Sequence, residues 1–262
     1  MSATLTRIVD TLVDSSGSSD PRMNRFLMKS PLQVISIVAL YLTLIFKIGP
    51  IFMKNRKPFS LRTTIIAYNV IQIVLNAAIF LKIFPLRSNL SLLCTPPDTS
   101  NSDTNLLEIE GHYYYILLKY FDLVETLFYV LRKKDRQISF LHVYHHIGIL
   151  AAAWISGKYF PGGQAMYVAM YNTVIHGIMY CYYLMSSWGG GTGGFLWWKK
   201  YVTALQIIQH CLIFISVFPS VVNMNCSYPK GWMAAFSVNV IVIIYLFGKF
   251  YKETYLTKAK QK

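Results

Sequence analysis

Residues 32–53 read LQVISIVALYLTLIFKIGPIFM, an apolar run with a single charged side chain. A helix needs about 20 mostly apolar residues to cross the hydrocarbon core of a bilayer. Further runs of this kind follow at 62–84, 112–130, 138–156, 165–187, 200–222 and 232–251. The pattern predicts an all-α integral membrane protein with seven transmembrane helices.

The composition of the whole chain agrees with this fold class. Hydrophobic residues make up 54% of the 262 residues, charged residues 14%, and the mean hydropathy is +0.40. Soluble domains carry about 25% charged residues. The lipid bilayer is therefore the expected surrounding. The net charge of +14 does not indicate nucleic-acid binding, because membrane proteins concentrate Lys and Arg in their cytosolic loops.

Loop charges orient the seven predicted spans. Fifteen Lys and Arg residues fall in the loops after the first, third and fifth runs and after the last, whereas the opposite loops hold only Arg87, Lys158 and Lys230. The excess assigns the first set to the cytosol. The third run, despite three charged residues, is kept as a span because it places the basic loops on one face. The expected organisation is a polar luminal tail (1–30), a transmembrane domain (31–252) and a basic cytosolic tail (253–262).

The loops on the luminal side contain two sequence features of an oxidising compartment. Asn89-Leu90-Ser91 and Asn225-Cys226-Ser227 are candidate glycosylation sequons. Cys94 and Cys226 lie in two of these loops, where they are able to pair or to remain two free thiols. We expect a disulfide.

Four runs carry polar side chains at helical spacing, so each set lies on one helix face. Ionisable groups are expensive inside a membrane and indicate a functional site. At about 1.5 Å of rise per residue, the four sets reach a similar depth near the cytosolic face. Together they suggest a shared polar cavity with a basic mouth and an apolar interior, which suits an amphiphile with an anionic head. The sets are Lys119, Asp122, Glu125 and Thr126; His142, His145 and His146; Asn172, His176, Tyr180 and Tyr183; and Thr203, Gln206, Gln209 and His210.

The His-x-x-His-His segment at 142–146 allows three interpretations. Membrane di-iron enzymes use such boxes, but they need more histidines than the five in the four polar sets, so no metal is expected. Buried structural histidines would explain one residue more easily than a cluster. A neutral imidazole is also a nucleophile near pH 7 and can accept an acyl group from a thioester. No G-x-S-x-G motif supports a serine nucleophile.

Four segments in order resemble a known family, the fatty acid elongases of the endoplasmic reticulum, which are condensing 3-ketoacyl-CoA synthases. The resemblance runs from residue 30 to the C-terminus. In one departure, the family usually has Lys-x-x-Glu-x-x-Asp-Thr, whereas the two acids are exchanged here. The segments are Lys119-x-x-Asp122-x-x-Glu125-Thr126, Leu141-His142-Val143-Tyr144-His145-His146, Asn172-x-x-x-His176-x-x-Met179-Tyr180-x-Tyr182-Tyr183 and Thr203-x-x-Gln206-x-x-Gln209.

The resemblance implies that six of the seven helices form a barrel around an acyl tunnel. It implies condensation of acyl-CoA with malonyl-CoA to a 3-oxoacyl-CoA, with release of CO2 and CoA and without a cofactor. It also implies residence in the endoplasmic reticulum membrane, with a second copy and other enzymes of the elongation cycle as candidate partners. Lys258 and Lys260 resemble a dilysine retrieval signal. A seven-helix receptor or transporter and a di-iron membrane oxidase remain the alternatives.

Roles follow for individual residues. We expect a ping-pong route in which His145 holds the acyl group and His176 positions the acyl carbonyl or the malonyl group. His142 and His146 would orient their neighbours, with Asp122 or Glu125 accepting from their ring N–H groups. The expected contacts to CoA phosphates are Lys119, Arg132, Lys134 and Lys199, assisted by Gln137, Asn172, Tyr182, Thr203 and Gln206; Tyr180 and Gln209 complete the predicted substrate-binding set.

Overall fold

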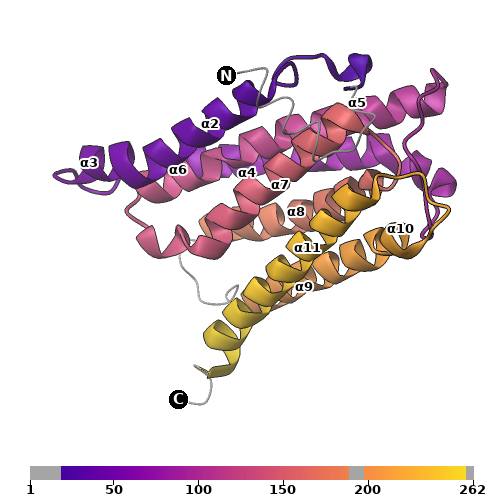
Figure 1. The fold of residues 1–262 in the computed structure, drawn as a ribbon. Helices are drawn as coiled ribbons and strands as arrows, with labels where there is room; N and C mark the ends of the chain where they lie inside the picture. The colour runs from indigo at the N-terminus through magenta and orange to yellow at the C-terminus, as the bar shows by residue number, and fades with distance from the viewer. Residues whose placement is uncertain (1–18, 189–197, 258–262) are drawn as a thin grey trace. The chain divides into compact units, whose positions relative to one another are not determined.

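The computed structural model describes residues 19–188 and 198–257, and within these ranges it contains helices and no strand. Figure 1 shows the helices in chain order. They are α2 (Pro31–Thr43), α3 (Gly49–Met53), α4 (Arg62–Ile83), α5 (Asp103–Asp122), α6 (Val124–Leu131), α7 (Phe140–Tyr159), α8 (Ala165–Trp188), α9 (Trp198–Val217), α10 (Pro219–Val222) and α11 (Lys230–Tyr251), with short turns η1 (Pro21–Met23), η2 (Leu44–Ile48), η3 (Phe84–Asn89), η4 (Asp135–Gln137) and η6 (Lys252–Thr257).

Four helical segments in the described ranges are long and apolar enough to cross a membrane: Pro31–Met53, Arg62–Asn89, Trp198–Val222 and Lys230–Thr257. These helices make the chain a multi-pass membrane protein. The other three predicted runs are also helical, in α5 with α6, in α7 and in α8. The count of seven spans and the barrel stay predictions, as does the placing of the termini. The predicted dilysine signal lies outside the described residues.

The third predicted run begins earlier than its hydropathy indicates. α5 starts at Asp103, where the Ser102 hydroxyl accepts a hydrogen bond from the Asn105 N–H. Glu108 and Glu110 lie in its first turns and lower the hydropathy there, which explains the predicted start at residue 112. The helix is then interrupted at Leu123, which separates α5 from α6.

The first membrane helix is continuous but locally widened. Ser30 and Gln33 form a capping box at its start. Pro50 has no N–H to donate to the preceding turn, and the chain forms a π-helical segment, η2, just before it. Gly49 permits the close approach of α3 to α6, because a Cβ at this position would lie 2.5 Å from Cγ1 of Val130. This packing places α2 beside the elements of the candidate site.

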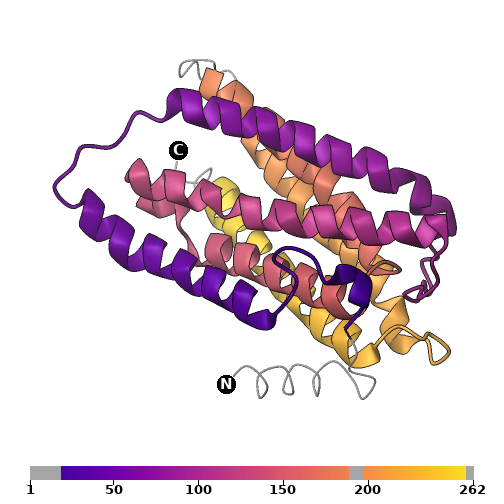
Figure 2. The ribbon, with the colours of Figure 1, turned by 90° about the horizontal axis from the view of Figure 1, so that it is seen from above.

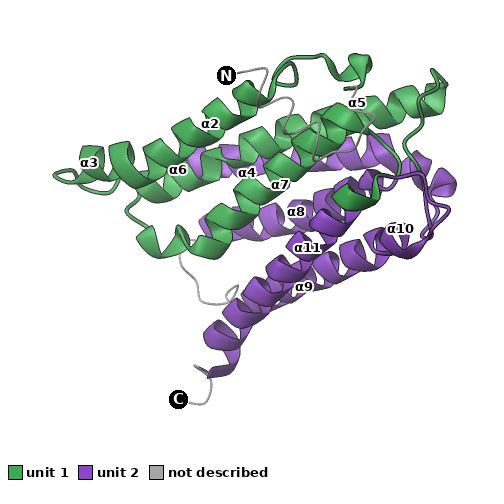
Figure 3. Ribbon diagram, in the orientation of Figure 1, with its two compact units in different colours: residues 1–61, 96–163, 229–232 green, residues 62–95, 164–228, 233–262 purple. Residues whose placement is uncertain are grey.

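The chain divides into two compact units, each built from segments far apart in sequence (Figure 3). Unit 1 comprises residues 1–61, 96–163 and 229–232, and in it α5 packs along α7 while η2 and α3 pack against α6. Unit 2 comprises residues 62–95, 164–228 and 233–262, and in it α8 packs between α4 and α9. α4 and α8 can be followed side by side in Figures 1 and 2.

The predicted disulfide is confirmed. Cys94 and Cys226 are joined in unit 2, with their Cα atoms 5.6 Å apart. Next to it, Thr95 and Gln164 exchange backbone and side-chain hydrogen bonds of 2.9 and 2.8 Å. The Gln164 side chain also donates to the backbone oxygen of Ser216. The loop after α4 is therefore fixed to the start of α8 and the end of α9.

We expect Cys94→Ala to lower the free energy of unfolding by about 2–4 kcal/mol, because the bond closes a long loop in the unfolded chain. Thermal unfolding in detergent measures the loss, and Cys211→Ala, which removes a free thiol, is the control. Non-reducing peptide mapping that finds both thiols free would contradict the pairing.

Candidate active site

A buried ion pair marks the centre of the polar set in unit 1. The Lys119 ammonium lies 2.7 Å from Oδ2 of Asp122, and both side chains are almost fully buried. The Tyr115 ring lies beneath the ammonium, 4.9 Å from Nζ. A charge in such surroundings is tolerated because it is paired. Lys119 thus has an internal partner, whereas the phosphate contact predicted for it stays a prediction.

The second carboxylate has a different partner. Glu125 lies on α6, beyond the interruption at Leu123, and accepts a hydrogen bond from the Tyr129 hydroxyl one turn later. Asp122 and Glu125 are both buried. The exchanged acids of the motif therefore belong to two helices and serve two separate contacts.

The three histidines of α7 form one cluster, as predicted. Ser139 caps the helix and accepts from the His142 backbone N–H at 3.2 Å. The ring centroids of His142 and His146 are 4.3 Å apart, and those of His145 and His146 are 6.0 Å apart. The Tyr129 ring stands edge-on to His142 at 5.4 Å. Aromatic contacts thus fix the cluster on the α6 side.

The ring of His142 is bonded to a hydroxyl. Its Nε2 lies 2.8 Å from Oγ1 of Thr126, and the same oxygen lies 2.9 Å from the hydroxyl of Tyr41 on α2. The partner expected for this ring was Asp122 or Glu125. Tyr41 belongs to a helix to which the sequence analysis gave no polar role.

In unit 2 the predicted residues of α8 meet a polar row on α4. His176 and Tyr180 are buried, with their rings 6.0 Å apart, and Tyr180 meets the edge of Tyr68 at 5.9 Å. Gln72 donates to the Tyr68 hydroxyl at 2.7 Å, and Asn76 donates to the Gln72 backbone and side-chain oxygens at 2.8 and 3.3 Å. This row was not predicted from the sequence, although its spacing of four residues within an apolar run indicates one polar helix face.

The predicted residues of α9 make local contacts within unit 2. The Gln206 amide donates to Sδ of Met179 at 3.3 Å, which joins α9 to α8. His210 is bonded to the backbone oxygen of Gln206 at 2.7 Å and stacks on Phe247. Thr203 donates to Lys199 O at 3.1 Å. The remaining members of the predicted set in this unit, Asn172, Tyr182 and Gln209, are buried.

The other residues predicted to bind CoA phosphates are accessible. Lys134, Gln137 and Lys199 are exposed, and Arg132 is partly exposed. Lys134 N donates to Tyr129 O at 2.8 Å, and Gln137 N donates to Lys134 O at 2.8 Å. This tight loop follows directly on the helix that carries Glu125. Its exposure permits phosphate contacts, which stay a prediction.

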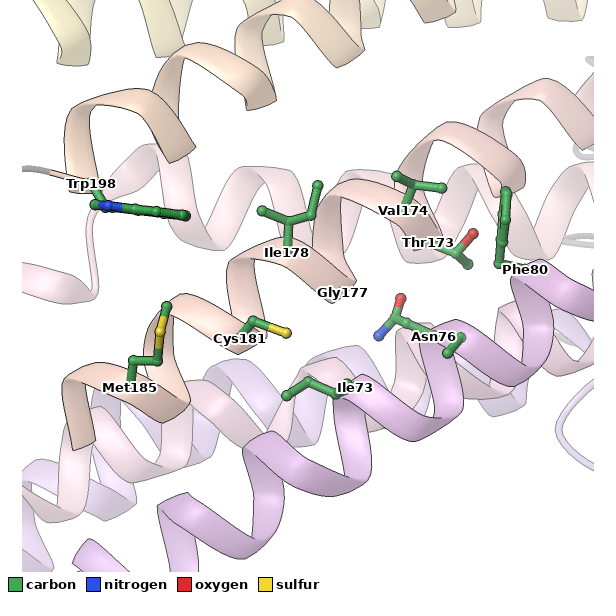
Figure 4. Close-up of a pocket in the computed structure, with 11 residues that line it drawn as sticks. Ile73, Asn76, Phe80, Thr173, Val174, Gly177, Ile178, Cys181, Met185 and Trp198 are labelled. Atoms are coloured by element: carbon green, nitrogen blue, oxygen red, sulfur yellow. The ribbon is translucent and has the colours of Figure 1, made fainter. Parts of the chain in front are cut away.

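Unit 2 also contains a groove of about 500 Å³ between α4 and α8, shown in Figure 4. Phe80 and Trp198 stand near opposite ends, and most of the lining is aliphatic or aromatic. Asn76 of the α4 row points its amide toward the α8 side, near Gly177 and Cys181. The lining suits a hydrocarbon chain.

His112 has a structural environment in unit 1. Its Nδ1 accepts from the Gly162 N–H at 3.2 Å, so its Nε2 carries the proton and donates to the Ser156 hydroxyl at 3.2 Å. The Glu108 carboxylate accepts from the Gly163 N–H at 2.9 Å. Gly162 has a φ of +85°, a conformation that favours glycine. A protonated Nε2 cannot act as a base toward Ser156, so this pair does not form a serine nucleophile.

The fold and these two polar sets define a class, a multi-pass membrane protein with a histidine cluster and an ion pair buried within its helices. Comparison with known proteins then gives the family. The model of the GNS1/SUR4 (ELO) family matches residues 26–262, and the chain belongs to this family.

Curated relatives resemble the chain over most of its length. A very long chain fatty acid elongase of Aedes aegypti is 35% identical over 93% of this chain and 69% of its own length. Very long chain fatty acid elongase 4 of Mus musculus is 38% identical over 90% of this chain and 76% of its own length. Very long chain fatty acid elongase 1 of Homo sapiens is 35% identical over 93% of this chain and 88% of its own length.

We expect Asp122→Asn to lower the free energy of unfolding by about 3–5 kcal/mol, because it leaves the buried Lys119 ammonium without its counter-charge. Asp103→Asn at the exposed start of α5 is the control. The double variant Lys119→Met/Asp122→Leu should regain most of the loss. Denaturation in detergent measures all three, and a double variant no more stable than Asp122→Asn would contradict the pairing argument.

Proposed function

We propose that the chain is a fatty acid elongase that condenses a long-chain acyl-CoA with malonyl-CoA. The observation that carries the proposal is the cluster of His142, His145 and His146, in the same compact unit as the buried ion pair, in a chain of the ELO family. Imidazoles can hold an acyl group, and buried donors can stabilise the oxyanion that forms during its transfer.

In the first proposed step, an unprotonated ring nitrogen of His145 attacks the thioester carbonyl of acyl-CoA. An N–C bond forms, the C–S bond breaks, and the proton of the other ring nitrogen passes to the departing CoA thiolate. The product is acyl-imidazole and free CoA. His145 is partly exposed and lies beside the more buried His146. This accessibility favours it over its neighbour as the residue that meets the substrate.

In the second proposed step, malonyl-CoA replaces CoA. The bond to its carboxylate breaks and releases CO2, and the resulting C2 carbanion attacks the acyl carbonyl. The N–C bond to His145 breaks, and the imidazole recovers a proton. The result is a 3-oxoacyl-CoA two carbons longer, with one proton consumed overall. From the sequence pattern, we assign His176 the positioning of the acyl carbonyl or of the malonyl group.

Location and topology belong to the same proposal. The excess of basic residues in the loops on one side supports a cytosolic Arg132–Lys134 turn, where CoA thioesters would be available. The Cys94–Cys226 disulfide supports an oxidising environment for the opposite side. Both agree with a protein of the endoplasmic reticulum membrane. Asn89 and Asn225 are exposed and available for glycans.

Incubation with acyl-CoA alone should release CoA and leave an acyl adduct on His145, because the first step does not need malonyl-CoA. We expect His145→Ala to reduce condensation by at least about 100-fold. Peptide mass mapping locates the adduct, and Cys181→Ala is the control that should retain both adduct and turnover. An adduct on Cys181, or an active His145→Ala enzyme, would exclude the imidazole route.

Arg132→Gln and Lys134→Gln should each raise the KM for acyl-CoA by roughly tenfold with little change in kcat, because a charged hydrogen bond to phosphate is lost. Steady-state turnover with varied acyl-CoA measures the effect. Lys133→Gln is the matched control, since Lys133 is exposed in the same turn but is not assigned to phosphate. An unchanged KM in both variants would remove the loop from the CoA site.

A further inference from the structure

Three side chains from three helices of unit 1 form one hydrogen-bonded chain. The hydroxyl of Tyr41 on α2 lies 2.9 Å from Oγ1 of Thr126 on α6, and that oxygen lies 2.8 Å from Nε2 of His142 on α7. Thr126 is fully buried and Tyr41 is 4% exposed, whereas His142 is partly exposed.

The number of protons restricts the direction of this chain. Each hydroxyl has one hydrogen to donate, and a neutral imidazole carries one N–H. In one direction Tyr41 donates to Thr126, Thr126 donates to Nε2, and the imidazole proton is on Nδ1. In the other, Nε2–H donates to Thr126 and Thr126 donates to Tyr41, whose own hydrogen then lacks a recorded acceptor among the described residues. A third arrangement, in which Tyr41 and Nε2–H both donate to Thr126, leaves the hydrogen of the fully buried Thr126 hydroxyl without an acceptor there and is excluded by that cost.

Burial decides between the two directions. A buried donor without an acceptor is strongly disfavoured, because it loses its hydrogen bond to water. The first direction leaves the remaining donor on His142, the accessible residue of the three. The second leaves it on Tyr41, which is buried. The first direction is therefore the stable one, and it leaves Nδ1–H available for a partner outside the chain.

The ring of His142 is also held in orientation. Tyr129 contacts it edge-on at 5.4 Å, and His146 packs beside it at 4.3 Å. Thr126 is near the start of α6, just after the interruption at Leu123, so the backbone that carries it is anchored by the turn next to the ion pair. Both the tautomer and the plane of the ring are thus set by neighbours on α2, α6 and α7 itself.

We propose that Tyr41 and Thr126 hold His142 as its Nδ1–H tautomer, so that His142 donates a hydrogen bond to the acyl oxygen during transfer. This assignment rests on the proposed condensation reaction. Nε2 is occupied by the Thr126 hydroxyl, so His142 is neither the nucleophile nor the base. Tyr41 and Thr126 are positioning residues, and α2 contributes to the site in addition to anchoring the chain.

Kinetics of hydroxyl variants test the relay. Thr126→Val should lower kcat roughly 100-fold with KM nearly unchanged, as for loss of an oxyanion donor, and Thr126→Ser should restore it to within about threefold. Tyr41→Phe should lower kcat roughly tenfold, and Tyr41→Phe/Thr126→Val should be no worse than Thr126→Val alone, because both act through one chain. Thr43→Val is the control, because it removes an exposed hydroxyl of α2 that donates to the Ala39 carbonyl of its own helix. Wild-type kcat in Thr126→Val, or losses that multiply in the double variant, would overturn the relay.

The tautomer of His142 can be determined without measuring enzyme activity. Solid-state NMR of ¹⁵N-histidine-labelled protein in bilayers, with His142 assigned by His142→Gln, should show a protonated Nδ1 and an unprotonated Nε2. Tyr41→Phe and Thr126→Ser should respectively disturb and retain this signature, and both are mild enough to keep the fold. A protonated Nε2 in the wild type would overturn the tautomer. A wild type without condensation but with the expected signature would instead refute the proposed function and leave the tautomer standing.

Discussion

A polar side chain inside a membrane helix must find its partner within the protein, because the surrounding hydrocarbon offers none. The pair of Lys119 and Asp122 is the strongest case, since an ammonium and a carboxylate are buried together in one helix. The polar side chains near this pair also have partners within the protein. Glu125 is bonded to Tyr129, Thr126 to Tyr41 and His142, and the histidine rings pack on one another. Each of these contacts gives a polar side chain in or near the histidine cluster a partner within the protein.

The rule gives α2 and α4 a second role besides crossing the membrane. Each carries a buried polar side chain bonded to another polar group: Tyr41 reaches α6, and Gln72 connects Tyr68 with Asn76 along α4. Neither helix contains a histidine or carboxylate. Both instead supply hydroxyls and amides, which can direct hydrogen bonds without the larger penalty of burying a charge.

Predictions from the sequence are correct where the signal is local: the apolar runs became helices and the His142–His146 segment became a cluster. The distant pair Cys94 and Cys226 was also predicted, because the loop charges assign both cysteines to one side of the membrane. No such constraint relates Tyr41 to Thr126, which are 85 residues apart, so their contact was not predicted. The start of α5 was misplaced because acidic residues reduce hydropathy without preventing a helix. The row on α4 was missed because, unlike the four predicted sets, it contains no histidine or carboxylate beside its Tyr, Gln and Asn residues.

The geometry also shows how each of the two exchanged acids, Asp122 and Glu125, fits its partner in this chain. Asp122 is short and lies on the same helix as Lys119, three residues away, where a short side chain suffices for a 2.7 Å contact. Glu125 is longer and reaches Tyr129 a full turn ahead on α6. A turn at Leu123 lies between them, and each carboxylate has its own partner. In this chain the shorter acid is therefore paired with Lys119, whereas the longer acid accepts from Tyr129, whose ring in turn contacts His142.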